Sequence, residues 1–163
     1  GNDVATGDIG EIWLKGPTVV RGYLGRARET AEAFTDGWFH TGDVGRLDDD
    51  GNLYVVDRLK DMIIRGGENI YAAEIEAALY EHADITEVAV IGVPSDRLGE
   101  EVGAVVRVRD GAALGEEDVR AHVAGQLAAF KVPAHVWITK DELPRNASGK
   151  VLKRELRDQM MSS

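Results

Sequence analysis

Apolar residues in the second part of the chain recur with the period of a strand in some segments and with the period of a helix in others. Val102, Ala104, Val106 and Val108 occupy every second position, which is the period of a half-buried strand. Elsewhere the apolar residues recur every three or four positions, as in an amphipathic helix. The expected elements are a strand over residues 62–65, a helix over 73–82, strands over 87–93 and 102–109, a helix over 116–129 and a strand over 136–138. This order predicts an α+β domain with a three-stranded sheet, flanking helices and a β-hairpin.

The first part of the chain has a different pattern, with short strands and frequent turn residues. Residues 9–14 alternate like a strand, and Asp50-Gly51 is a favoured turn pair between two further strand-like runs. The remaining expected elements are one or two helical turns over residues 28–34 and a strand running into a loop over 37–43. We therefore expect a short all-β piece over residues 1–58, followed by the α+β domain over residues 59–163.

Composition narrows the classes of protein to consider. The 163 residues carry a formal net charge of −10, which argues against a general nucleic-acid binder because such proteins need a surplus of Lys and Arg. The chain has no Cys, so disulfides and thiolate metal sites are excluded. No apolar run approaches the ~20 residues of a membrane span. We expect a globular protein of the cytoplasm without a transmembrane segment.

Several common catalytic motifs are absent from the sequence. It contains no Gly-x-Ser-x-Gly, no His-Glu-x-x-His and no Walker phosphate loop. The histidines His40, His82, His122 and His135 lie too far apart in sequence to suggest a local metal site. We therefore identify no metal ligands and expect each histidine to be a structural or surface residue.

Three ordered segments indicate a specific chemistry. They are residues 38–43 (Trp-Phe-His-Thr-Gly-Asp), residues 57–71 (Asp-Arg-Leu-Lys-Asp-Met-Ile-Ile-Arg-Gly-Gly-Glu-Asn-Ile-Tyr) and residues 144–150 (Pro-Arg-Asn-Ala-Ser-Gly-Lys). In this order they resemble the C-terminal motifs of the adenylate-forming enzymes, which include acyl-CoA synthetases, peptide-synthetase adenylation domains and luciferases. Residues 7–12, 20–23 and 99–100 agree with the same resemblance. Taken together, the motif sequences are most similar to those of a fatty-acyl or medium-chain acyl-CoA ligase.

The resemblance implies a two-part enzyme with a large N-terminal domain and a small C-terminal lid. Such enzymes couple a carboxylic acid, here a fatty acid, with ATP to form an acyl-adenylate and pyrophosphate. The lid then rotates, and CoA attacks the adenylate to give a thioester and AMP. Mg²⁺ is expected to enter with ATP. Residues 1–58 would be the C-terminal end of the large domain, and residues 59–163 would be the lid.

The resemblance also implies roles for individual residues. Asp43 and Arg58 match residues that contact the ribose of the nucleotide, and a carboxylate suits a vicinal diol because it offers two acceptor oxygens. Lys60 matches the hinge on which the lid swings. Gly66 and Gly67 match a loop that lines the tunnel for the pantetheine arm of CoA. The alternatives are a turn aspartate, a surface ion pair of the arginine with Asp57 or Asp61, and an ordinary tight glycine turn.

Lys150 matches the lysine that drives adenylation. A fixed ammonium beside the reacting phosphate stabilises charge that develops in the transition state. Lysine acts there as a point charge that needs no bidentate geometry. The alternative is a solvated lysine in a basic tail, since residues 140–158 carry more bases than acids.

The absence of an initiating Met and of the upstream motifs leads us to expect an excised fragment that is catalytically incompetent alone. Its missing partner would be the N-terminal domain of the same chain. Two alternatives stay open. One is the lid of an amino-acid-activating adenylation domain. The other is a stand-alone interaction module that binds nucleotide or CoA.

Overall fold

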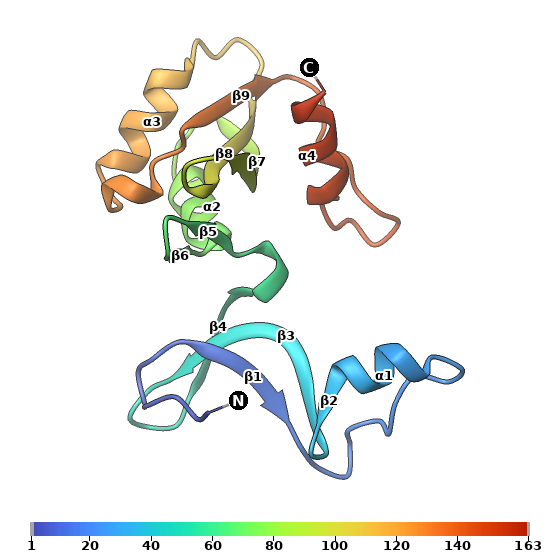
Figure 1. The fold of residues 1–163 in the computed structure, drawn as a ribbon. Helices are drawn as coiled ribbons and strands as arrows, with labels where there is room; N and C mark the ends of the chain where they lie inside the picture. The colour runs from blue at the N-terminus through green and yellow to red at the C-terminus, as the bar shows by residue number, and fades with distance from the viewer. Residues whose placement is uncertain (1, 163) are drawn as a thin grey trace. The chain divides into compact units, whose positions relative to one another are not determined.

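The computed structural model describes residues 2–162, which divide into two compact units (Figure 1). The first unit extends to Lys60 and the second begins at Asp61. No helix in the described part of the chain is both long enough and apolar enough to cross a membrane.

The first unit is built around one long strand, β3 (Trp38–Leu47). It pairs antiparallel with β1 (Gly10–Leu14), β2 (Phe34–Thr35) and β4 (Leu53–Arg58). The helical turns expected before β2 are present as α1 (Ala27–Ala33). This part of the chain is therefore mostly β rather than all-β, because α1 interrupts the run of strands.

Residues with positive φ angles form the turns of both hairpins in this sheet. Asp36 and Gly37 join β2 to β3 with φ angles of 51° and 81°, and positive φ at both central residues is the requirement of the tightest hairpin turns. Gly51 has φ 81° in the expected hairpin between β3 and β4. Hydrogen bonds from the side chain and backbone of Asn52 hold the pKa of Asp48 below its usual value and fix this loop.

The second unit is an α+β domain, as expected. Its elements are β5 (Ile63–Arg65), β6 (Glu68–Ile70), α2 (Ala72–Tyr80), β7 (Ile85–Ser95), β8 (Gly99–Val108), α3 (Glu116–Ala124), β9 (His135–Thr139) and α4 (Lys153–Met161). Short 3-10 turns lie at Leu59–Asp61 (η1) and Ala129–Lys131 (η2). The helix expected over residues 116–129 ends earlier, at Ala124, with Gly125 at the C-cap position.

One sheet of five strands organises this unit, and it unites the expected three strands with the expected β-hairpin. The order is β6-β5-β8-β7, and β9 also pairs with β8. All the pairs are antiparallel except β8 with β9, which is parallel. The β5–β6 hairpin joins the sheet because Arg65 pairs with Gly99 at the start of β8.

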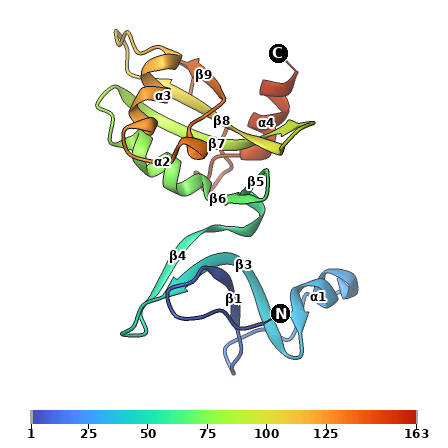
Figure 2. The same ribbon diagram turned by 60° about the vertical axis from the view of Figure 1, so that its left-hand side comes forward.

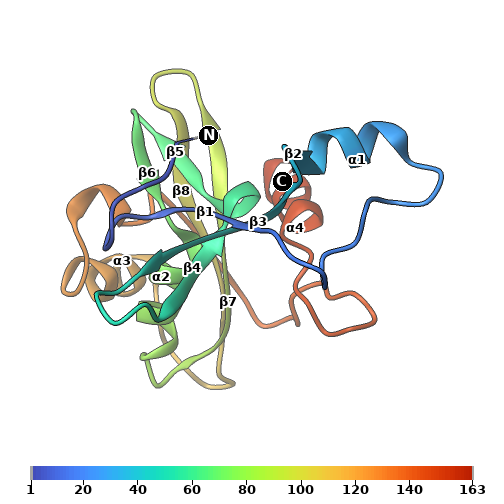
Figure 3. The ribbon, with the colours of Figure 1, turned by 90° about the horizontal axis from the view of Figure 1, so that it is seen from below.

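Both faces of this sheet are buried, whereas the sequence pattern predicted a half-buried strand. On one face, the alternating residues of β7 and β8 pack with α2 and α3 around Ile75, Leu79 and Val119. On the other face, Val105 is 2% exposed and packs with Leu156 of α4. Figures 2 and 3 show the same helices around the sheet from two further directions. The basic C-terminal helix thus forms part of the core.

Gly103 marks a close approach inside the sheet. A Cβ atom at this position would lie 2.7 Å from Cγ2 of Val93 and 2.8 Å from Cζ3 of Trp137. Real Cβ atoms do not make contacts this short, so both neighbours would have to move. The absence of a side chain at Gly103 is therefore a packing requirement.

We predict that Gly103→Ala lowers the free energy of unfolding by about 1–3 kcal/mol, the usual cost of overpacking. Gly125→Ala is the matched control, because Gly125 has φ −72° and a Cβ there makes only ordinary contacts. We expect the control to be neutral or slightly stabilising. Urea unfolding of the chain, followed by circular dichroism, measures both. Equal stability of the two variants would contradict this account of the packing.

Candidate functional site

Asp43 and Arg58 lie opposite each other on β3 and β4 and form an ion pair. The distance from Nε of Arg58 to Oδ1 of Asp43 is 2.6 Å, and their side chains are 48% and 30% exposed. An ion pair this exposed contributes little net stability. The structure therefore brings two predicted ribose-binding residues together.

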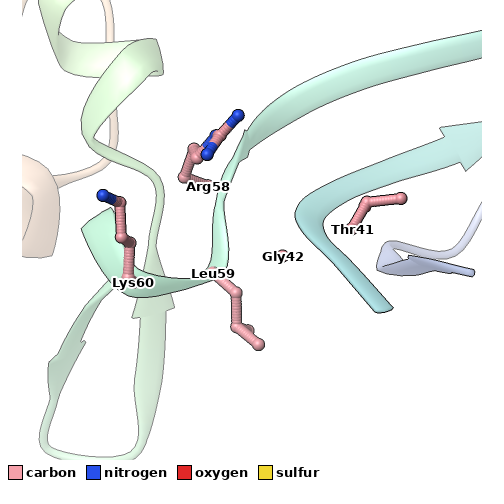
Figure 4. Close-up of a pocket in the computed structure, with 5 residues that line it drawn as sticks. All are labelled: Thr41, Gly42, Arg58, Leu59 and Lys60. Carbon is pink, nitrogen blue, oxygen red and sulfur yellow. The ribbon is translucent and has the colours of Figure 1, made fainter. Parts of the chain in front are cut away.

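An open depression lies beside this ion pair, within the first unit. It is lined by Thr41, Gly42, Arg58, Leu59 and Lys60 (Figure 4). The nitrogen ends of Arg58 and Lys60 extend to one side of the chain, and Leu59 points to the other. Two cationic side chains and a glycine backbone therefore border the depression, whose wall is mostly apolar.

The irregular stretch of β3 just before Asp43 is held by strand β1. The hydroxyl of Thr41 donates to the carbonyl of Ile12 at 2.8 Å and accepts the N–H of Asp43 at 3.0 Å. Gly42 has φ 70°, a left-handed conformation that favours glycine, and its N–H donates to Oε1 of Glu11 at 3.3 Å. These bonds set the direction in which the Asp43 side chain projects from the sheet.

Glu11 is a supporting residue that the sequence interpretation did not assign. Its Oε2 accepts the indole N–H of Trp13 at 2.7 Å, and the Trp13 ring stacks on His40 at 4.0 Å between centroids. The sequence pattern could have indicated this contact, because residues two apart on a strand share one face. Glu11 and Trp13 therefore brace the strand that leads into Asp43.

Lys60 lies in the 3-10 turn η1 at the end of β4. It is the last residue of the first compact unit. Its side chain is exposed.

Gly66 and Gly67 form the two-residue turn between β5 and β6, with φ angles of 59° and 92°. Both values fall in the left-handed region, which other residues adopt at a cost. Gly66 also donates its N–H to the carbonyl of Leu98 at 2.8 Å. The tight-turn alternative accounts for both glycines by itself, and their role in a CoA tunnel stays a prediction.

Lys150 is exposed and follows a turn that Asn146 holds closed. Oδ1 of Asn146 accepts the N–H of Lys150 at 2.9 Å and the N–H of Ser148 at 3.1 Å. The backbone of Asn146 pairs with that of Lys150, its N–H donating to the Lys150 carbonyl at 2.9 Å. Gly149 has φ 83° in the same turn. The backbone of this lysine is thus fixed while its ammonium faces outward.

Two of the four histidines meet in space although they are far apart in sequence. The rings of His82 and His122 lie 5.1 Å apart in an edge-to-face contact, and Nε2 of His122 lies 2.9 Å from the carbonyl oxygen of Ala78. Within residues 2–162, no group of three or more His, Cys, Asp or Glu side chains is placed to hold a metal ion.

Comparison with known proteins gives this geometry its context. Residues 74–150 match the family profile of the AMP-binding enzyme C-terminal domain. The chain is 49% identical over 157 residues to a 2-succinylbenzoate–CoA ligase of Geobacillus kaustophilus and 51% identical over 157 residues to a feruloyl-CoA synthase of an Amycolatopsis species. Each alignment covers 96% of this chain and 32% of the relative. The chain therefore spans about a third of the length of these relatives.

Another relative is a long-chain-fatty-acid–CoA ligase of Yersinia pestis, 46% identical over 98% of this chain and 28% of the relative. Fatty-acyl ligases are therefore one of several kinds among the relatives. Relatives of other kinds match this chain at similar identity, so the resemblance of the motifs to fatty-acyl ligases does not single out a fatty acid.

Solved structures of adenylate-forming enzymes superpose closely on this chain. MatB of Rhodopseudomonas palustris with bound ATP superposes with a TM-score of 0.90 at 43% identity, covering 98% of this chain and 32% of that one. The o-succinylbenzoate CoA synthetase of Bacillus subtilis, in complex with an acyl-adenylate intermediate, superposes with a TM-score of 0.87 at 37% identity. That match covers 95% of this chain and 31% of the other. The chain therefore carries an AMP-binding enzyme C-terminal domain and belongs, as a C-terminal portion, to the superfamily of adenylate-forming enzymes, in which its relatives are CoA ligases.

Proposed function

We propose that this chain is the C-terminal part of an ATP-dependent acid–CoA ligase. The observation that carries the proposal is the exposed Lys150 on a turn with a fixed backbone. The contact between Asp43 and Arg58 supports it, because these are the residues expected to meet the ribose. The unit boundary directly after Lys60 supports the hinge role of that residue. Residues 1–58 are then the end of the large domain, and residues 59–163 are the lid.

In the first half-reaction, a carboxylate oxygen of the acid attacks the α-phosphorus of ATP. A new P–O bond forms to the acyl oxygen, and the bond to the bridging oxygen breaks to release pyrophosphate. Asp43 accepts hydrogen bonds from the ribose hydroxyls, and Arg58 orients Asp43 and contacts the same sugar. The ammonium of Lys150 stabilises the charge that develops on the phosphoryl and acyl oxygens.

In the second half-reaction, the thiol of CoA attacks the acyl carbon. The C–S bond forms, the bond between the acyl carbon and the adenylate oxygen breaks, and AMP leaves while the thiol proton passes to solvent. Rotation about Lys60 withdraws Lys150 and brings in the turn of Gly66 and Gly67. The missing side chains at these glycines let the thin pantetheine arm pass close to the backbone.

The acid is the least constrained part of the proposal. A fatty acid is one candidate, because one relative is named for long-chain fatty acids. Relatives named for 2-succinylbenzoate and feruloyl acids make these acids further candidates. An amino-acid-activating lid is a weaker alternative, because all three of these relatives are CoA ligases.

Packing supports a need for a further domain. Among the described residues, Val44 is the one apolar side chain of the first unit that is fully buried. The same unit exposes large apolar residues such as Val55, Leu14 and Trp38. We propose that these surfaces pack on the rest of the large N-terminal domain and that the chain is inactive alone. ATP would bring Mg²⁺ with it, and the cysteine-free composition suits a reducing cytoplasm.

We predict that Lys150→Ala in the complete ligase slows adenylation by about 10²–10³-fold, the usual effect of losing one stabilising contact to developing charge. Thioester formation from supplied acyl-adenylate should stay nearly unchanged, because the lysine is withdrawn in that step. Rapid-quench assays of the two half-reactions measure the difference. Lys140→Ala is the control, since Lys140 is another exposed lysine of the same unit. Equal losses in both half-reactions would refute the role of Lys150.

We predict that Asp43→Asn weakens ATP binding in the complete ligase by about tenfold, because the carboxylate makes stronger, charge-assisted hydrogen bonds than an amide. The KM for CoA should not change. Asp49→Asn is the matched control, since Asp49 is an exposed acid of the same unit outside the site. Equilibrium titration with ATP measures the affinity. An unchanged ATP affinity in Asp43→Asn would remove Asp43 from the nucleotide site.

A further inference from the structure

We propose that Glu87 is a positioning residue for Lys150, and that it acts through Arg145. The inference rests on the proposed function, because it matters to catalysis only if Lys150 is the adenylation lysine. Glu87 lies on β7, 58 positions before Arg145 in the chain, outside the three motif segments. The connection between them is therefore visible only in the folded structure.

Both carboxylate oxygens of Glu87 bind the segment that leads to Lys150. Oε2 accepts the backbone N–H of Leu143 at 3.0 Å, and Oε1 accepts a hydrogen bond from Nη2 of Arg145 at 2.8 Å. The side chain of Glu87 is 15% exposed and that of Arg145 is 38% exposed, so the bond to Leu143 is partly buried and the bond to Arg145 is open to water. The charge on Glu87 makes both bonds stronger than hydrogen bonds between neutral groups. Glu87 therefore ties this segment to the central sheet.

Arg145 carries the connection onward to the residue before Lys150. While Nη2 binds Glu87, Nη1 donates to the carbonyl of Gly149 at 2.7 Å. Arg145 also forms a β-bridge with Val151 on the far side of the turn. One planar guanidinium thus spans from the sheet to the backbone on which Lys150 sits.

The two ends of the turn are held by the core on the same face of the sheet. Leu143 is 4% exposed before the turn, and Leu156 of α4 is 2% exposed after it. The N–H of Leu152 donates to the carbonyl of Pro144 at 2.8 Å, which closes the base of the loop. The Glu87–Arg145 pair is thus a polar link between the sheet and a turn whose ends are packed.

The electrostatics of Glu87 agree with this arrangement. Burial by itself would raise the pKa of Glu87, but the hydrogen bonds from Leu143 and Arg145 and the positive charges of Arg145 and Arg107 outweigh it and hold the pKa below its usual value. Nη1 of Arg107 lies 3.7 Å from Oε2. The carboxylate is therefore charged at neutral pH and able to bind Arg145.

A fixed backbone matters here because Lys150 acts as a point charge at the end of a flexible four-carbon side chain. A displacement of about 1 Å in a catalytic group can cost ~10²-fold in rate. Loss of one anchor, with Asn146 still in place, should cost less. We expect an effect of about tenfold on adenylation when the Glu87–Arg145 link is broken.

The test uses Glu87→Gln, Arg145→Gln and the double variant. In the present chain, amide hydrogen exchange at Gly149 and Lys150 should be about tenfold faster in each single variant, and the double variant should add little. In the complete ligase, adenylation should fall about tenfold while thioester formation from supplied acyl-adenylate is unchanged. A general loss of stability would not separate the two half-reactions in this way. Thermal unfolding checks that each variant folds, and the partly exposed Arg145 gives a second variant if Glu87→Gln does not.

Glu74→Gln is the matched control. Glu74 forms a comparable ion pair with Lys131, at 2.6 Å, away from the turn. The inference is overturned if the control matches Glu87→Gln in both assays, or if exchange at Gly149 and Lys150 is unchanged in Glu87→Gln. It is also overturned if exchange quickens but adenylation does not slow. That last result would leave the proposed function intact if Lys150→Ala still slows adenylation. If Lys150→Ala adenylates as fast as the unchanged enzyme, the proposed function itself fails.

Discussion

The burial of strands β7 and β8 on both faces is the constraint on which the second unit depends. An apolar strand pair with two buried faces must be covered twice, and burial of apolar area is the main favourable term in folding. Helices α2 and α3 cover one face, and α4 covers the other through Leu156. Because α4 must return to that second face, the segment between β9 and α4 is held at both ends. That segment carries Lys150.

This arrangement separates two tasks that Lys150 has to combine in its proposed catalytic role. The ammonium of Lys150 is exposed and able to reach a substrate, while its backbone is fixed by Asn146 and by the Glu87–Arg145 link. A fixed backbone limits the orientations that must be lost when the charge is placed, which is the source of catalytic advantage in pre-organised sites. In the first unit, Glu11 of β1 holds the backbone of Gly42 beside Asp43 in a similar way. In both units, a carboxylate on a neighbouring strand thus supports the segment that carries a predicted site residue.

Local patterns predicted most of the elements, because turn pairs and apolar periods act over a few residues. The Asp50-Gly51 hairpin and the helix–strand–strand–helix–strand order are present as expected. The second buried face was missed because Gly103 and Arg107 made that side of β8 look polar, although Val105 is buried there. The β5–β6 hairpin was not joined to the sheet because its pairing with β8 spans distant residues. Glu87 was missed for the same reason, since its partners lie more than fifty positions away.

The central claim is that Lys150 carries a positive charge on a fixed backbone, and that the active site on which it acts is completed by another part of a longer ligase. The most direct test is to incubate the purified 163-residue chain with ATP, Mg²⁺ and a panel of fatty and aromatic acids, and to measure release of pyrophosphate and formation of acyl-adenylate. The account predicts no acyl-adenylate from this chain, with formation restored in the complete ligase. Turnover by the chain alone would contradict it, because the site would then have to lie within these residues.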